Sequence, residues 1–113
     1  MKEEDIELIP TRIYEKNVKL LAKKYASMAD DLRAFKKSIR QKPEQGSPLG
    51  GGFRKVRMAI SSKGKGKSGG ARVITLNCIV KQEVQSIILV TIYDKDWQEN
   101  ISDKEIRDAL ATL

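Results

Sequence analysis

The residues in this sequence whose types and spacing suit chemistry are cations. Between Gln45 and Gln82 there is no acidic residue, and the segment contains eight basic ones: Arg54, Lys55, Arg57, Lys63, Lys65, Lys67, Arg72 and Lys81. The rest of the 113-residue chain carries 14 basic and 15 acidic residues, so this segment accounts for the net charge of +7. Positive charge without compensating carboxylates is typical of a face that binds a polyanion. A solvated surface strand and loop is the alternative.

The centre of this segment, Ser61–Gly70, consists of lysine, glycine and serine. Glycine lets backbone amides approach a phosphate, and lysine neutralises the phosphate charge. The spacing is not that of a nucleotide-binding Walker A loop, and strand-like residues rather than a helix follow it. We therefore interpret the segment as a flexible arm that contacts an RNA backbone. A disordered basic loop is the competing interpretation.

Two helices are predicted before this segment. A short strand over Asp5–Ile9 comes first, because apolar and charged residues alternate there. Apolar residues then recur at helical spacing in a helix that starts near Thr11 and in a second helix capped by Ser27 and Asp30. The two stripes are Tyr14, Val18, Leu21 and Tyr25, and Met28, Leu32, Phe35 and Ile39. We expect an antiparallel helical hairpin whose stripes pack against a sheet.

The cations themselves are predicted to lie on strands and in the loop between them. Residues 46–52 form a turn-rich passage, and three strands follow: Phe53–Ile60, Arg72–Val80 and Ser86–Tyr93. Alternation in the first of these strands directs Lys55 and Arg57 to solvent. A hairpin at Lys81–Gln85 joins the other two strands, which read as central strands of the sheet.

A short C-terminal helix completes the predicted fold. Ser102–Glu105 has the form of a capping box and precedes the apolar residues Ile106 and Leu110. The predicted order is β-α-α-β-β-β-α in a single domain that spans residues 1–113. The fold class is therefore α+β, a mostly antiparallel sheet with the helical hairpin packed on one face and the other face partly open.

The composition also limits the function classes. No apolar run approaches the roughly 20 residues that cross a bilayer, and the acidic residues 1–5 do not resemble a signal peptide. With no histidine and a single cysteine, Cys78, we expect no metal site, no cofactor and no internal disulfide. We expect a cytoplasmic protein that contacts no membrane.

A family pattern extends over four passages: Gly52–Arg57, Ser62–Ile74, Leu89–Lys95 and Gln98–Glu105. With the preceding helices, this pattern resembles the RelE/HigB/ParE superfamily of toxins from bacterial type II toxin-antitoxin modules, and most closely its RelE/HigB-like branch. The resemblance implies a RelE-like fold and a ribosome-dependent endoribonuclease, or mRNA interferase. It also implies three kinds of partner: a cognate antitoxin encoded next to the toxin, mRNA on the ribosome, and operator DNA reached only through the antitoxin.

The cations are compatible with metal-independent RNA scission. Attack of a 2′-hydroxyl on the adjacent phosphate needs a base, an acid and positive charge around the phosphorane. In a chain without histidine the base would be a lysine whose pKa is lowered by neighbouring cations, and the candidates are Lys55, Lys63, Lys65 and Lys67. We expect Arg57 and Arg72 to stabilise phosphate charge.

Further roles follow from the resemblance. Tyr93 and Lys95 match positions of the family pattern, so Tyr93 is expected to act as an acid or to stack on a base, unless it is an aromatic residue at the edge of the core. Further RNA contacts are expected from Arg54, Lys63, Lys81 and Lys95.

Three other functions remain open. A ParE-like toxin would inhibit DNA gyrase and cut nothing, although the dense lysine and arginine cluster argues against it. A non-catalytic RNA-binding module would use Tyr93 and Trp97 for stacking. A degenerate toxin would serve only as a partner-binding scaffold. The apolar stripe of Ile101, Ile106 and Leu110 either contacts the antitoxin or, as we favour, packs on the protein's own sheet.

Overall fold

The two long helices form where the apolar stripes predict them. In the computed structural model, which describes residues 5–113, α1 spans Arg12–Lys24 and α2 spans Met28–Gln41. The hydroxyl of Thr11 accepts a hydrogen bond from the backbone N–H of Tyr14 (3.1 Å) and caps α1. The same hydroxyl donates to the carbonyl of Val90 (2.7 Å), so the start of α1 is fixed to a central strand.

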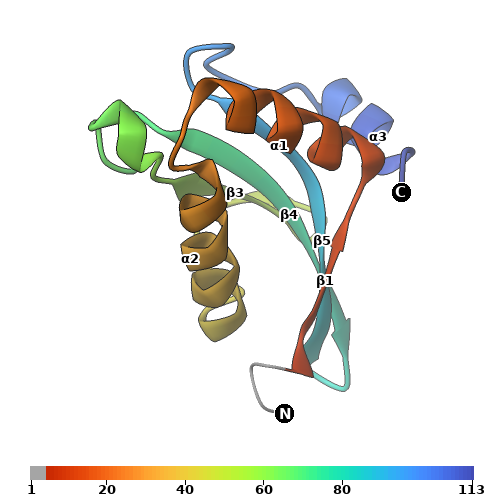
Figure 1. Ribbon diagram of the computed structural model, residues 1–113. Helices are drawn as coiled ribbons and strands as arrows, with labels where there is room; N and C mark the ends of the chain where they lie inside the picture. The colour runs from red at the N-terminus through yellow and green to blue at the C-terminus, as the bar shows by residue number, and fades with distance from the viewer. Residues whose placement is uncertain (1–4) are drawn as a thin grey trace.

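The start of α2 differs from the expectation in its details. Ser27 occupies the N-cap position, but its side chain makes no capping bond to the helix backbone. Its hydroxyl instead donates to the carboxylate of Asp31 (2.6 Å), one turn into the helix. From the turn at Tyr25–Ser27 the two helices diverge instead of lying side by side along their length (Figure 1).

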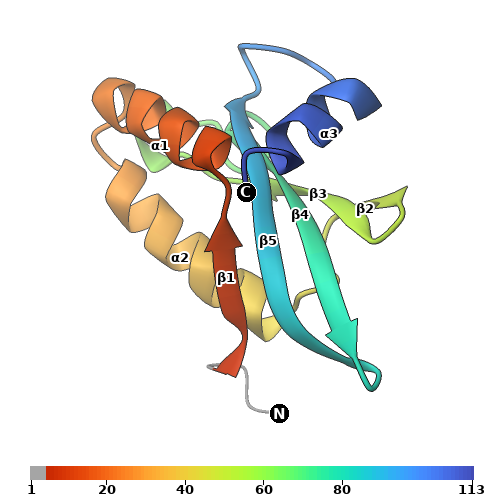
Figure 2. The same cartoon turned by 90° about the vertical axis from the view of Figure 1, so that its right-hand side faces the viewer.

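The sheet has five strands in the order β1-β5-β4-β3-β2. β1 pairs with β5 in parallel, and all the other neighbours are antiparallel (Figure 2). The strands are β1 (Glu7–Pro10), β2 (Ser47–Gly50), β3 (Phe53–Met58), β4 (Ala71–Val80) and β5 (Glu83–Asp94). The α+β class, the mostly antiparallel sheet and the helices on one face are as predicted.

The two faces of the sheet carry separate cores. Buried residues of α1 and α2, such as Leu21 and Ile39, pack with Val73 and Ile92 on one face. The short helix α3 (Asp103–Leu110) covers part of the opposite face near β5. Its predicted capping box is present, because Ser102 and Glu105 each accept from the other's backbone N–H. Within residues 5–113, no helix combines the length and apolar character needed to cross a membrane.

The C-terminal apolar stripe packs on the protein's own sheet. Ile106 is buried against β5 residues, and the partly buried Ile101 and Leu110 join the same cluster. This contact confirms the favoured use of that stripe. Since α3 reaches only the β5 side, the β3 side of this face remains open.

One strand was not expected. Residues 46–52 were predicted to be turns, but Ser47–Gly50 forms the edge strand β2 and pairs with β3. Gly50, Gly51 and Gly52 all have positive φ and reverse the chain tightly enough for pairing. Proline has no backbone N–H to donate to a neighbouring strand. Pro48 is tolerated because β2 is an edge strand, which has a neighbour on one side only.

The hairpin between β4 and β5 is tighter than predicted. Only Lys81 and Gln82 lie between the strands, both with positive φ, as in a two-residue hairpin turn. Residues 83–85, which were expected in the loop, form the start of β5.

Candidate functional site

Three of the predicted site residues form a row across the sheet. Arg57 of β3 pairs with Arg72 of β4, and Arg72 pairs with Tyr93 of β5. Because directly paired residues project from the same face, and Tyr93 packs in the cluster beneath α3, the row lies on the face opposite α1 and α2. Lys55 lies on this face too, opposite Ile74. The fold therefore gathers Lys55, Arg57, Arg72 and Tyr93.

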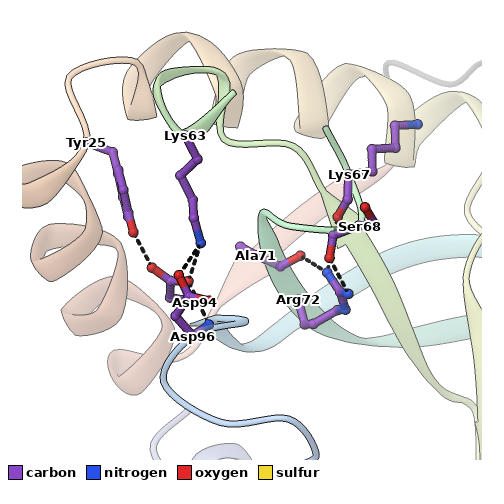
Figure 3. A network of polar contacts seen from close by, with 8 residues as sticks. All are labelled: Tyr25, Lys63, Lys67, Ser68, Ala71, Arg72, Asp94 and Asp96. Atoms are coloured by element: carbon purple, nitrogen blue, oxygen red, sulfur yellow. Dashed lines mark hydrogen bonds and ion pairs between the residues drawn. The ribbon is translucent and has the colours of Figure 1, made fainter. Parts of the chain in front are cut away.

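Arg72 is the most unusual of these residues, because its side chain is buried with the residue only 7% exposed. One terminal nitrogen, Nη1, donates to the carbonyls of Lys67 (3.2 Å) and Ala71 (3.1 Å), and Nη2 donates to the carbonyl of Ser68 (2.9 Å) (Figure 3). No carboxylate within residues 5–113 forms an ion pair with it. Burial and the nearby Arg57 lower the pKa of Arg72 below its ordinary value.

A buried guanidinium without a counterion is a suitable anion site. These three bonds use three of the five N–H donors of the guanidinium, which leaves two for a ligand. A charge removed from water is stabilised by an opposite charge that hydrogen-bonds to it. An oxyanion beside Arg72 and Arg57 would supply that charge.

The lysine and glycine loop is anchored at both ends. It begins with a 3₁₀ turn, η2 (Ser61–Lys63). Asp31 of α2 accepts bonds from the backbone N–H (2.9 Å) and hydroxyl (2.6 Å) of Ser61. At the other end, a Cβ on Gly70 would lie 2.1 Å from the carbonyl oxygen of Met58, so only glycine fits there. The segment is a closed loop with a fixed base, and neither a free arm nor a disordered loop describes it.

Lys63 does not lie where an RNA-binding residue or a base would be expected. Its ammonium forms an ion pair with Asp94 (2.7 Å) and a second with Asp96 (3.0 Å), and its side chain is 5% exposed. Burial alone would lower the pKa of Lys63, but the hydrogen bonds to Asp94 and Asp96 outweigh it and raise the pKa. Lys63 therefore stays protonated and paired within the protein, an arrangement that favours neither of the two roles predicted for it.

The remaining loop lysines and Lys95 are exposed. Lys65 and Lys67 are exposed residues of the loop, and the Lys67 side chain points away from Arg72 (Figure 3). Lys67 and Arg57 line a groove of about 290 Å³ at the edge of β3, together with Asp31 and Ser61. Lys95 is held close to the loop by a bond from its backbone N–H to the carbonyl of Gly70 (3.1 Å).

Two predicted RNA contacts lie away from this cluster. The guanidinium of Arg54 donates to the carbonyls of Gln45 (3.0 Å) and Gly46 (2.9 Å), and Arg54 projects from the helix-covered face with Val56. Lys81 is in the β4–β5 turn, nine residues along β4 from Arg72 and so about 30 Å away. Neither is brought near Arg72.

Tyr93 is buried beneath α3, and its hydroxyl has no hydrogen-bond partner among residues 5–113. Burial raises the pKa of Tyr93, Arg72 lowers it, and Glu105 raises it, with a net rise. Tyr93 lines a pocket of about 490 Å³ that also includes the exposed Trp97. Because its pKa is raised, the Tyr93 hydroxyl keeps its proton at neutral pH.

Sequence reasoning missed the carboxylates that organise this site. Asp94 was not among the predicted site residues, but it is fully buried and accepts bonds from Lys63, from the hydroxyl of Tyr25 (2.5 Å) and from the backbone N–H of Asp96 (2.9 Å). Asp31 lies on α2 outside its apolar stripe, and its bonds to Ser61 join residues 30 positions apart in the sequence. A charged residue directly after the apolar run of β5 is the one available signal.

Both carboxylates make folding stability depend on pH. Burial would raise the pKa of Asp94, but bonds from Lys63 and Tyr25 lower it below the ordinary 3.8, and bonds from Ser27 and Ser61 outweigh burial in the same way at Asp31. The two ionised carboxylates therefore contribute their full share to the free energy of unfolding above pH 3.8. This contribution is lost as the pH falls through their lower pKa values in the folded protein.

We expect the free energy of unfolding, measured with urea, to fall more steeply below pH 3.8 in the native protein than in an Asp31→Asn/Asp94→Asn variant. Equal falls would show that other carboxylates cause the acid sensitivity.

The fold and the site together define a small α+β protein with a cationic, arginine-centred site on the sheet face opposite its two long helices. A family model of the RelE toxin of the RelE/RelB toxin-antitoxin system matches residues 11–112. The chain therefore belongs to the RelE toxin family, as the sequence resemblance predicted. It is a toxin of a toxin-antitoxin system, and this family membership implies an antitoxin partner.

Proposed function

We propose that this toxin is a metal-independent endoribonuclease that cleaves mRNA on the ribosome. The observation that carries the proposal is the buried Arg72 guanidinium, which forms no ion pair with a carboxylate of the described residues and lies beside Arg57. Such a pair suits the scissile phosphate, whose charge grows in the phosphorane. Membership of the RelE family supports the same reaction.

The reaction needs only groups that the chain supplies. The 2′-oxygen attacks the adjacent phosphorus while a base takes its proton, and the bond from phosphorus to the 5′-oxygen breaks as an acid protonates that oxygen. Lys55, Lys65 and Lys67 are the candidate bases, because Lys63 is held by Asp94. Arg57 and Arg72 stabilise the phosphorane. Tyr93, which keeps its proton, is the candidate acid if movement of α3 exposes it.

The proposed setting follows from the substrate. Because its proposed substrate is mRNA on the ribosome, the toxin acts in the cytoplasm. Lys95 and the exposed loop lysines contact the RNA backbone. The antitoxin is the partner that restrains the toxin, and operator DNA is reached through the antitoxin.

The experiment is induced expression in bacteria, with mRNA 5′ ends mapped on a translated message and on the same message without a start codon. We expect growth arrest with new 5′ ends on the translated message alone. An Arg57→Ala/Arg72→Ala variant, expressed to the same level, is the matched control and should produce neither effect. Arrest without new RNA ends would contradict the proposal and indicate inhibition of gyrase. Absence of arrest would indicate a binding module or a degenerate toxin.

A further inference from the structure

The ion pair between Lys63 and Asp94 is buried at the end of the sheet where the cationic row lies. Its ammonium and carboxylate are 2.7 Å apart, and the two side chains are 5% and 0% exposed. The phenol of Tyr25 donates to the other carboxylate oxygen, and its ring centroid lies 5.6 Å from the Lys63 ammonium. Asp96, the second partner of Lys63, is mostly exposed, so Asp94 is the principal partner.

This pair joins the loop to the end of β5. Lys63 ends the 3₁₀ turn that begins the loop, and Asp94 directly follows Tyr93. On the other side of the loop, the carbonyls of Lys67 and Ser68 accept hydrogen bonds from the Arg72 guanidinium. Figure 3 shows the two sides together, with Lys63 directed at Asp94 and the loop carbonyls directed at Arg72.

Between these two attachments the loop contacts itself, because the Lys65 side chain packs on Gly69 and the Ser68 hydroxyl donates to the carbonyl of Lys65 (3.5 Å). Gly64 and Gly66 have positive φ and no atom within 4 Å of the position of a Cβ, so the chain there lies in open space. Glycine-rich backbone has wide conformational freedom, and the attachments at its ends must restrict it. The pair of Lys63 and Asp94 is the buried, charged attachment on the side away from Arg72.

We propose that Lys63 and Asp94 are positioning residues that act through the loop on Arg72. Their ion pair holds residues 64–70 in the conformation in which the carbonyls of Lys67 and Ser68 orient the Arg72 guanidinium. The consequence for RNA cleavage rests on the proposed function, whereas the consequence for the loop and for Arg72 does not.

The first test measures the loop itself in the folded, full-length protein. Trypsin cleaves after exposed lysines, and we expect cleavage after Lys65 and Lys67 to accelerate about tenfold or more in Asp94→Asn and in Lys63→Met. Asp30→Asn is the matched control, because the Asp30–Arg33 pair has the same 2.7 Å separation but both side chains are exposed. Its cleavage rate should change less than about twofold. Circular dichroism establishes that each variant is folded, and Lys63→Met decides the matter if Asp94→Asn does not fold.

The second test measures Arg72. Its guanidinium NMR signals, assigned by their loss in Arg72→Lys, should shift in Asp94→Asn and Lys63→Met and stay in place in Asp30→Asn.

The third test measures cleavage by Asp94→Asn and Lys63→Met on ribosomes programmed with mRNA. Their kcat should fall about tenfold or more while KM changes little, because the misplaced guanidinium acts on the transition state.

Unchanged trypsin cleavage or unchanged Arg72 signals in the folded variants would overturn the proposal. An open loop with wild-type kcat would also overturn it, since the ion pair would then be merely structural. If the wild-type protein itself cleaves no mRNA, the proposed function fails, and the trypsin and NMR measurements still decide whether the ion pair positions Arg72.

Discussion

Replacing Arg72 with alanine is expected to slow mRNA cleavage on the ribosome by about 10²–10³-fold, the usual loss when one preorganised donor to a developing oxyanion is removed. The guanidinium is held in place before substrate arrives, because three loop and strand carbonyls fix its two terminal nitrogens. The measurement is single-turnover cleavage of a defined mRNA on programmed ribosomes.

Two further variants make this expectation specific. Arg72→Lys keeps the charge but loses the planar fork, so it should recover only a small part of the rate. Arg57→Ala removes an exposed arginine at the paired position of β3, and its loss should be smaller than that of Arg72→Ala. Equal rates for Arg72→Ala and the native protein would remove Arg72 from the reaction and would require another cation to bind the phosphate.

Local sequence patterns predict the elements of this fold well, because most of them depend on interactions that are close in sequence. The stripe from Tyr14 to Tyr25 specifies α1, and the capping box at Ser102 and Glu105 starts α3 where expected. The edge strand β2 could not be found in this way. Its four residues carry no alternating pattern, and the strand exists because the glycines after it turn the chain back onto β3.

The candidate site was only partly predictable for a related reason. Alternation along β3 placed Lys55 and Arg57 on one face, and the pairing of β3 with β4 and of β4 with β5 then brought Arg72 and Tyr93 beside them. Charge alone cannot distinguish a free lysine from one held by a distant carboxylate. Lys63 and Asp94 are 31 residues apart, and their ion pair depends on the tertiary fold.

The burial of Arg72 could not be predicted from the pattern either, which gave only its position at the start of a central strand and a role in stabilising phosphate charge. Two of its three carbonyl partners, Lys67 and Ser68, belong to a loop whose conformation follows from glycines and from anchors at Asp31 and Asp94. The loop thus has a second role besides presenting Lys65 and Lys67 to solvent, because its backbone orients the arginine.

Replacing Ile92 with alanine is expected to lower the free energy of unfolding by about 2–5 kcal/mol, as for other large aliphatic residues in closed cores. Ile92 is 0% exposed, pairs with Val73 and packs among the residues of α1 and α2 on β5, the strand that also carries Tyr93 and Asp94. This loss is a large part of the roughly 5–15 kcal/mol that stabilises a domain of this size. Urea denaturation followed by circular dichroism measures it.

Ile79→Ala is the matched control, because the same side chain on β4 is 63% exposed and its removal should cost under about 1 kcal/mol.

A comparison of Ile92→Ala with Arg72→Ala separates the effect on stability from the effect on the reaction. Ile92 projects from the helix-covered face, whereas Arg72 projects from the opposite one, so Ile92→Ala should keep near-native cleavage per folded molecule at low temperature. Arg72→Ala should stay folded under the same conditions and lose cleavage. A loss of cleavage in folded Ile92→Ala as large as that in Arg72→Ala would show that packing beneath β5, and not the arginine alone, sets the geometry of the site.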